Sequence, residues 1–146
     1  IGPSTEAFIQ TVKNFKERYP EKADSIIMTG NITDRTQLYT YCRRAKIICM
    51  TSRTEGACIA TLESMFFGAY PIITNYSDFA LDTTNWGNCG RIVENGNSDK
   101  LSAELYNAMV DNDLLSKCII SQNYARKMFD YNELSKKLVE MLENIN

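Results

Sequence analysis

The sequence has 146 residues, of which 44% are hydrophobic and 23% are charged, and its formal net charge is −2. This length and composition are typical of one globular domain with a single core, and the slight negative charge argues against nucleic-acid binding, which needs a basic surface. No apolar run approaches the ~20 residues of a membrane span, and the amino terminus shows no signal peptide.

The cysteines and the lack of histidine limit the chemistry that this chain can carry. Because the chain has no histidine, a Ser-His-Asp site, a Cys-His site and a histidine-ligated metal are excluded within it. No two cysteines form a C-x-x-C pair, so we expect buried thiols of a cytoplasmic protein and no disulfide or zinc framework. The cysteines are Cys42, Cys49, Cys58, Cys89 and Cys118.

Helical and strand patterns alternate from the amino terminus. Residues 6–18 carry apolar side chains at helical spacing, which predicts an amphipathic helix. Tyr19 and Pro20 end this helix, because the residue before a proline avoids the helical conformation. The apolar run at residues 25–29, closed by Gly30, predicts a buried strand.

The middle of the chain continues the alternation. Asp34 and Gln37 have the spacing of a capping box and predict the start of the next helix. Within residues 45–50, the apolar run at 47–50 predicts a second buried strand. A helix over residues 58–67 follows, and Gly68 stands at its usual C-terminal position.

The last half begins with a strand and ends in helices. Residues 70–74 predict a third strand, residues 75–88 are polar and turn-rich with a short helical turn at 79–81, and residues 90–93 predict an edge strand. Three helices are expected after this: one with an apolar face of Leu101, Leu105, Ala108 and Met109, one over residues 114–129, and one that begins with a capping box at Asp130 and Glu133.

This alternation predicts an α/β fold with a mostly parallel sheet covered by helices on both faces. Ligands of such sheets bind at the carboxyl ends of the strands, and there the strand at 47–50 leads to Glu55 while the loop 74–78 reaches the same edge. Glu55 and Glu63 lie on either side of a helix start. An ionised carboxylate can accept hydrogen bonds from both hydroxyls of a diol, and a helix start offers N–H groups to a phosphate.

A series of short motifs carries a resemblance to a known family. In chain order they are Gly30-Asn31-Ile32, Thr51-Ser52-Arg53-Thr54-Glu55-Gly56, Leu62-Glu63-Ser64-Met65, Gly68-Ala69-Tyr70-Pro71-Ile72-Ile73, Gly87-Asn88-Cys89-Gly90 and Glu94-Asn95-Gly96. These residues resemble the C-terminal, donor-binding domain of GT-B glycosyltransferases, in particular the retaining enzymes of family 4 (group 1). The resemblance implies a Rossmann-like, three-layer α/β/α domain that forms one half of a GT-B fold.

The resemblance also implies a role for each matched residue. Glu55 would bind hydroxyls of the donor sugar, with Gly56, Ala57 and Cys58 bringing backbone N–H groups close to the sugar and diphosphate. Glu63 would bind the ribose diol of the nucleotide. The pocket wall near the nucleotide would be formed by Thr74, Asn75, Tyr76 and Ser77. The family needs no catalytic metal, so no metal or cofactor is expected, and no residue of this chain is assigned as catalytic.

The implied reaction is transfer of a hexosyl-type sugar, with retention, from a nucleotide-diphosphate sugar to an acceptor hydroxyl. Family members of this kind act in surface polysaccharide or glycan synthesis, in the cytoplasm or at the inner face of the membrane. The acceptor, a glycan or a lipid-linked molecule, would be held by an N-terminal domain that these residues do not include.

Three departures from the family pattern matter. Ala57 and Cys58 stand where the family has a bulky residue and a glycine, which would widen the sugar site. The basic pair that holds the diphosphate is missing from residues 1–4, and the N-terminal domain is absent. We therefore expect residues 1–146 to be one donor-binding domain from a longer enzyme, lacking its first strand, and to be inactive alone.

Other interpretations stay open at the level of sequence. A non-catalytic α/β interaction module is one, although no predicted strand ends in the aspartate of a receiver domain, and a sugar phosphorylase on the same fold is another. Arg53 is more typical of a surface residue than of a phosphate ligand, and Tyr76 and Trp86 could stack on a base or pack their loops. On the last helix, Leu134, Leu138 and Met141 form an apolar stripe that we expect to be partly exposed.

Overall fold

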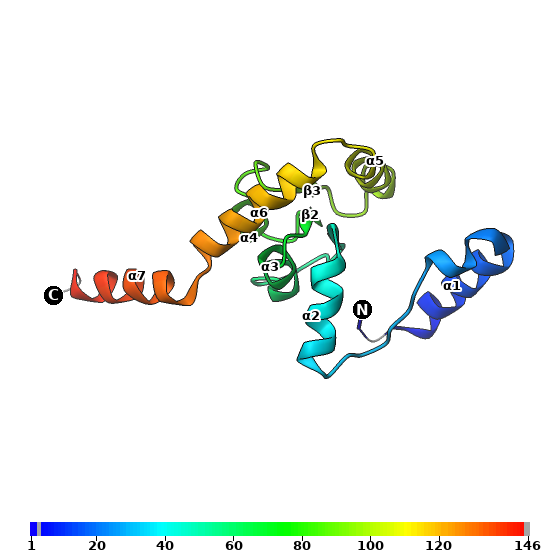
Figure 1. The fold of residues 1–146 in the computed structure, drawn as a ribbon, viewed down its shortest axis with the longest axis horizontal. Coiled ribbons are helices and arrows are strands. Elements are labelled where there is room, and N and C mark those ends of the chain that lie inside the picture. Colours follow the sequence, from blue (N-terminus) through cyan, green and yellow to red (C-terminus); the bar gives the residue numbers. More distant parts are fainter. Residues whose placement is uncertain (3, 145–146) are drawn as a thin grey trace. The chain divides into compact units, whose positions relative to one another are not determined.

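The computed structural model describes residues 1–2 and 4–144, which divide into two compact units, Ile1–Thr40 and Tyr41–Asn146. The boundary falls within helix α2 (Arg35–Arg44) (Figure 1). Asp34 caps this helix as expected, because its Oδ1 accepts a hydrogen bond of 2.8 Å from the Thr36 N–H.

The first unit contains helix α1 (Glu6–Arg18) and the 3-10 helix η1 (Pro20–Ser25), and α1 has the predicted bounds. The Thr5 hydroxyl caps its start by accepting from the Phe8 N–H at 3.3 Å. The strand predicted over residues 25–29 is wrong, since Ser25 closes η1 and residues 26–29 form no strand. A strand needs a neighbour to pair its N–H and C=O groups, and among the described residues none pairs with this run.

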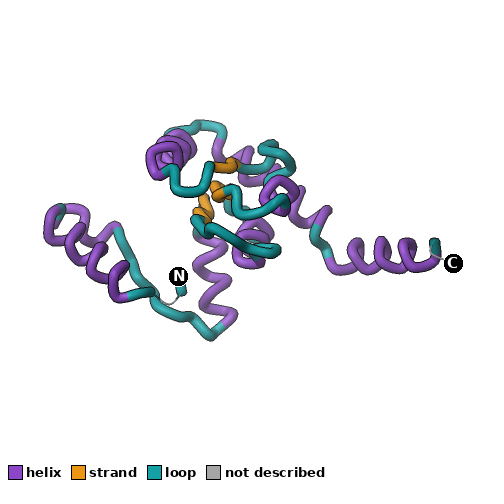
Figure 2. Tube along the Cα trace, turned by 180° about the vertical axis from the view of Figure 1, so that it is seen from behind, coloured by secondary structure: helices purple, strands orange, loops and turns teal. Residues whose placement is uncertain are grey.

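The second unit is built on a three-stranded parallel sheet in the order β1-β2-β3, seen as three orange segments side by side in Figure 2. Its strands are β1 (Ile47–Met50), β2 (Tyr70–Thr74) and β3 (Arg91–Val93), and its connecting helices are α3 (Ile59–Phe66) and α4 (Phe79–Thr83). This confirms the expected Rossmann-like α/β architecture with a parallel sheet, and all three strands lie within a residue of their predicted bounds.

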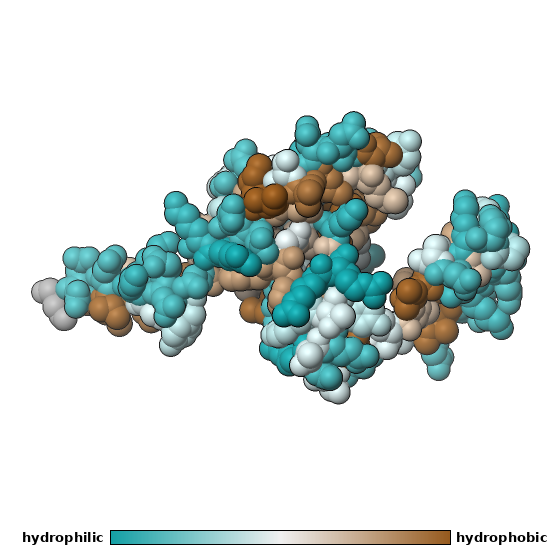
Figure 3. Space-filling model, in the orientation of Figure 1, coloured by the Kyte–Doolittle hydropathy of each residue, from teal (hydrophilic) through white to brown (hydrophobic). Residues whose placement is uncertain are grey.

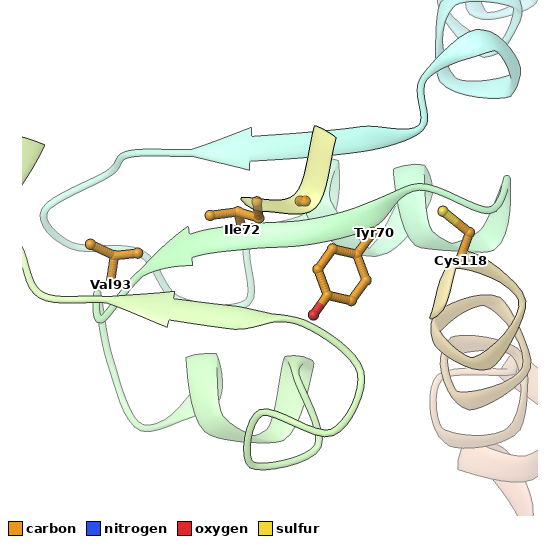
Figure 4. Packing of buried hydrophobic residues seen from close by; sticks show 5 residues of the cluster. Tyr70, Ile72, Val93 and Cys118 are labelled. Carbon is orange, nitrogen blue, oxygen red and sulfur yellow. The ribbon is translucent and has the colours of Figure 1, made fainter. Parts of the chain in front are cut away.

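The central strand β2 is buried on both faces of the sheet. Side chains alternate along a strand, so Ile72 and Ile73, both fully buried, point to opposite sides. Ile72 belongs to a cluster with Tyr70, Val93 and residues of helices α5 (Ser98–Met109) and α6 (Leu114–Met128), in which Cys118 lies near Tyr70 at the amino end of β2 (Figure 4). Ile73 packs on the other face with Ala80 of α4. The two-sided cover is the arrangement that parallel sheets require.

Strand β1 departs from the prediction of a buried strand. It pairs with β2 along one edge only, and Cys49 in it is exposed. The other four cysteines are buried, and all five are free thiols. The expectation of buried thiols is therefore confirmed for four positions and wrong for Cys49, because an edge strand has a neighbouring strand on one side only.

Helix α6 crosses the amino ends of the strands. The Cys118 Sγ donates to the carbonyl oxygen of Lys46, just before β1, at 3.3 Å. The Ser121 hydroxyl donates to the carbonyl oxygen of Cys89, two residues before β3, at 2.6 Å. At Gly90 an added Cβ would lie 2.7 Å from Pro71 Cγ, so this edge is also closely packed. The helix thus covers the end of the sheet where the strands begin, its amino edge. The opposite end, where the strands finish, is the carboxyl edge and is covered by loops.

Apolar side chains remain exposed on the C-terminal helices. In α7 (Tyr131–Glu143), capped by Asp130, the stripe of Leu134, Leu138 and Met141 is 46%, 58% and 64% exposed, as expected from the sequence. Met109, predicted to lie on the apolar face of α5, is instead 73% exposed near the end of that helix, where Figure 3 shows hydrophobic side chains at the surface. No helix of the described residues has the length and apolar character needed to cross a membrane.

Candidate functional site at the carboxyl ends of the strands

Three loops meet at the carboxyl edge of the sheet. They are residues 51–58 after β1, residues 75–78 after β2 and residues 94–97 after β3. The strands are parallel and in register, with Met50 beside Ile73 and Thr74 beside Val93, so the loops leave the sheet in the same direction. The fold therefore brings the predicted loops 51–58 and 74–78 to one edge, together with a third loop to which no role was assigned.

Hydrogen bonds from side chains to backbone carbonyls join these loops. Thr74, buried at the end of β2, donates its hydroxyl to the carbonyl oxygen of Ser52 at 2.5 Å. Asn95 donates its side-chain amide to the carbonyl oxygens of Asn75 at 2.8 Å and of Arg53 at 3.3 Å. Each loop is thus tied to a neighbour, although many of their residues are exposed.

Glu55 lies half-buried in the loop after β1. The Ser52 hydroxyl donates to Glu55 Oε1 at 2.7 Å, which fixes the direction of the carboxylate. A carboxylate has about four acceptor positions on its two oxygens, so a single bond leaves room for hydroxyl groups of a ligand. The structure therefore gives Glu55 a defined orientation and remaining acceptor capacity.

The next three residues lead into helix α3. Gly56 and Ala57 are exposed, and no atom lies within 4 Å of the place that a Cβ on Gly56 would occupy, so packing alone does not require glycine there. Cys58 is buried and adopts the left-handed conformation, with φ +34° and ψ +64°, and its Sγ lies 3.0 Å from the Thr61 hydroxyl. This conformation costs a side-chain-bearing residue roughly 1–2 kcal/mol more than glycine.

Glu63 stands in the second turn of α3 and is half-buried. It lies on the helix that begins directly after the Glu55 loop, while Thr61, Ser64 and Met65 of the same helix are buried. The backbone N–H groups of the first turn lie between the two glutamates in the chain, as the sequence predicts.

The four predicted wall residues after β2 have different environments. Asn75 is exposed, and Thr74 is buried with its hydroxyl turned to the backbone of the β1 loop. Tyr76 is only 5% exposed because its ring packs in the core with Ile73, and its hydroxyl lies 3.4 Å from that of Thr83. Burial raises the pKa of the Tyr76 phenol. Tyr76 therefore packs its loop and does not present its ring to a base.

Two further side chains bear on the expected pocket. The Ser77 hydroxyl is buried, and among the described residues it has no hydrogen-bond partner. Trp86, whose role the sequence left open, is 70% exposed, and it lies in the segment that enters β3 at the opposite, amino edge of the sheet. Trp86 is thus not part of this site in the described unit.

A concave surface of about 250 Å³ opens at the carboxyl edge, and its lining was largely missed by sequence reasoning. Of the predicted binding residues only Thr74 lines it; the others are Thr51, Arg53, Glu94, Asn95, Gly96, Asn97, Ser98 and Leu101. The signal that could have found it is the polar run Glu94-Asn95-Gly96-Asn97, which directly follows a strand. Its first three residues were listed among the family motifs, but no binding role was assigned to any of them.

Metal ligands are not grouped in the described part of the chain, where no three His, Cys, Asp or Glu side chains are placed to hold an ion. The chemical groups that the site offers are carboxylates, hydroxyls, amides, backbone N–H groups and the Arg53 guanidinium. Such groups suit a ligand rich in hydroxyls, which hydrogen bonds can hold without a metal.

Comparison with known proteins identifies the family of the chain. The chain matches the family model described as glycosyl transferases group 1 over residues 11–128, which include all three loops and both glutamates. A search of curated proteins found no match. Because the family model covers most of the chain, the protein belongs to the group 1 glycosyl transferase family.

Proposed function

We propose that this chain forms the donor-binding part of a retaining GT-B glycosyltransferase of family 4. It would hold a nucleotide-diphosphate sugar while a hexosyl group passes to an acceptor hydroxyl. The observation that carries this proposal is Glu55, oriented by the Ser52 hydroxyl at 2.7 Å in the loop that leads into α3 of a group 1 glycosyl transferase.

The proposed roles follow from the chemistry of each group. Glu55 accepts hydrogen bonds from sugar hydroxyls, and Glu63 accepts them from the two ribose hydroxyls. The loop Gly56–Ala57 and the first turn of α3 after Cys58 present backbone N–H groups to the diphosphate, where the positive end of the helix dipole favours negative charge.

The contribution of these residues to the reaction is positioning and charge stabilisation. A sugar held by Glu55 has its anomeric carbon fixed relative to the acceptor, and orientation of this kind can replace much of the entropic cost of a bimolecular step. N–H groups directed at the diphosphate stabilise the charge that develops on the leaving group. We assign no general base in this chain and propose that the reaction needs no metal.

We also propose that the acceptor, a glycan or lipid-linked molecule, is held by a domain outside these residues. The residues described here would then bind the donor weakly and catalyse no transfer alone. A role in surface polysaccharide or glycan synthesis, in the cytoplasm or at the inner face of a membrane, fits a donor of this class.

Ligand-observed NMR on the 146-residue chain tests the proposal. The probes are UDP, GDP and ADP at millimolar concentration, their glucose and mannose conjugates, and glucose 1-phosphate, with inorganic phosphate as a competitor. We expect saturation transfer to the ribose of one nucleotide, lost in Glu63→Ala and kept in Glu140→Ala, a control on the exposed surface of α7.

The alternatives give different results in the same experiment. Transfer to a sugar phosphate competed by inorganic phosphate, without dependence on a nucleotide, would indicate a phosphorylase. Equal nucleotide binding by Glu63→Ala and Glu140→Ala would contradict the role of Glu63. A folded chain that binds none of the probes would count against donor binding by these residues and favour an interaction module.

A further inference from the structure

The side chain of Asn95 occupies a central place among the three loops. Its Nδ2 lies 2.8 Å from the carbonyl oxygen of Asn75 and 3.3 Å from that of Arg53. Both partners are acceptors, so the amide nitrogen, and not the amide oxygen, must face them. A residue of the third loop thereby uses its two N–H groups to bridge the other two.

Further hydrogen bonds link the segment that Asn95 holds to Glu55. Arg53 follows Ser52, whose carbonyl oxygen accepts from the Thr74 hydroxyl and whose own hydroxyl donates to Glu55 Oε1. The peptide groups on both sides of Arg53 are therefore held by the end of β2 and by the loop after β3. The carboxylate of Glu55 is held in turn by the segment that these bonds fix.

Little else holds this segment in place. Thr51, Arg53, Thr54 and Gly56 are exposed, so burial contributes little to the conformation of the loop. Exposed loops are mobile unless hydrogen bonds or packing restrain them. Asn95 itself lines the concave surface of about 250 Å³ at this edge, where a bound ligand would exclude water from its amide.

We propose that Asn95 is a positioning residue, whose amide holds residues 52–55 so that the Glu55 carboxylate meets the donor sugar; this inference rests on the proposed function. Asn95 acts through the loop and does not need to touch the sugar. Its loss should loosen the loop first and weaken donor binding as a consequence, while the sheet beneath stays unchanged.

The experiment compares Asn95→Ala with a matched control. Asn88→Ala removes a similar bond, from the Asn88 amide to the carbonyl oxygen of Asn85 at 2.9 Å, in a loop at the opposite edge of the sheet. We expect the dissociation constant of the nucleotide sugar, measured by NMR titration, to rise roughly tenfold in Asn95→Ala and to stay unchanged in Asn88→Ala.

Conservative variants separate positioning from simple structural support. Asn95→Asp places an acceptor-only carboxylate against two carbonyl oxygens, so it should weaken binding more than Asn95→Ala does. Asn95→Gln keeps the amide and should recover part of the affinity. If Asn95→Ala and Asn88→Ala unfold at the same temperature but only Asn95→Ala loses affinity, the loss comes from positioning of the loop and not from a general loss of stability.

A second readout needs no ligand. Backbone 15N order parameters at residues 52–56 should be lower in Asn95→Ala than in the wild-type chain and in Asn88→Ala, with those of β2 unchanged. Unchanged order parameters at residues 52–56 would overturn the inference, as would unchanged sugar-nucleotide affinity in Asn95→Ala beside a clear loss in Glu55→Ala. If the wild-type chain binds no probe, the proposed function fails, and the order parameters still decide whether Asn95 holds the loop.

Discussion

The two edges of the sheet in the second unit are held in different ways. At the amino edge, helix α6 lies across the strand starts and places buried groups such as Ser121 against the backbone. At the carboxyl edge, exposed loops are joined by Thr74 and Asn95 through bonds to carbonyl oxygens. The difference indicates that hydrogen bonds at the amino edge contribute more to stability than those at the carboxyl edge, which keeps polar groups accessible to a ligand.

The largest expected effect lies in the core shared by both edges. Ile72→Ala removes a fully buried side chain from the central strand and should lower the free energy of unfolding by about 2–5 kcal/mol, because it leaves a cavity. Ile120→Ala, at a 52% exposed position of α6, should change it by less than about 0.5 kcal/mol. Urea unfolding measures both, and equal losses would contradict the assigned core.

The second-largest loss of stability is expected when a hydroxyl-to-carbonyl hydrogen bond at the amino edge is removed. Ser121→Ala leaves the carbonyl oxygen of Cys89 without its donor in a buried place, so the free energy of unfolding should fall by about 1–3 kcal/mol. Ser116→Ala, at an exposed position of the same helix, is the control and should have no measurable effect. Ligand binding should be unchanged in both variants.

The bond from Thr74 at the carboxyl edge should matter less for stability and more for ligand binding than the bond from Ser121 does. Thr74→Val keeps the shape of the side chain but removes the hydroxyl that donates to Ser52, in a loop that water can reach. The free energy of unfolding should fall by about 1 kcal/mol or less, while the affinity for the nucleotide sugar falls several-fold. A larger loss of stability than in Ser121→Ala, with binding intact, would break the comparison between the two edges.

The smallest expected effect concerns the ion pair between Asp111, in the turn after α5, and Lys117 of α6. The hydrogen bond from Lys117 lowers the pKa of the Asp111 carboxyl and raises the pKa of the Lys117 ammonium. The Asp111 contribution is therefore present above the ordinary carboxyl pKa of about 3.9 and is lost as the pH falls through the lower, folded value. The Lys117 contribution is complete below the ordinary lysine pKa of about 10.4 and is lost as the pH rises through its raised, folded value.

Lys117→Met tests this pH dependence. The stability difference from the wild-type chain should be small at pH 7, since the pair is accessible to water, and should shrink further as the pH falls below about 4. Urea midpoints between pH 3 and pH 7 measure it. A difference that stays constant over this range would mean that packing of the lysine stem, and not the ion pair, is responsible.

Local signals in the sequence predicted much of the fold. The apolar spacing of residues 6–18 and the break at Tyr19-Pro20 gave the bounds of α1, and the apolar run Tyr70–Thr74 gave the bounds of β2. Residues 25–29 have an equally strong apolar pattern and form no strand. A strand is completed by backbone groups distant in the sequence, so local pattern alone cannot establish that its partner is present.

Local sequence patterns also predicted only part of the candidate site. The positions of Glu55 and Glu63 beside a helix start follow from spacing and fold rules. The bonds from Thr74 to Ser52 and from Asn95 to Arg53 join residues 22 and 42 positions apart, and no local pattern indicates them. The inward turn of Tyr76 and the left-handed backbone of Cys58 likewise depend on how the loops pack after the sheet has formed.

The exposed thiol of Cys49 makes the chain suitable for site-selective labelling without engineered cysteines. Among the described cysteines it alone is accessible to a reagent, and it lies two residues before the loop that carries Glu55. Desolvation raises the pKa of its thiol, so the reactive thiolate is scarce at neutral pH and maleimide or spin-label coupling should proceed faster in mildly alkaline buffer. A fluorophore there would report directly on movement of the β1 loop when a ligand binds.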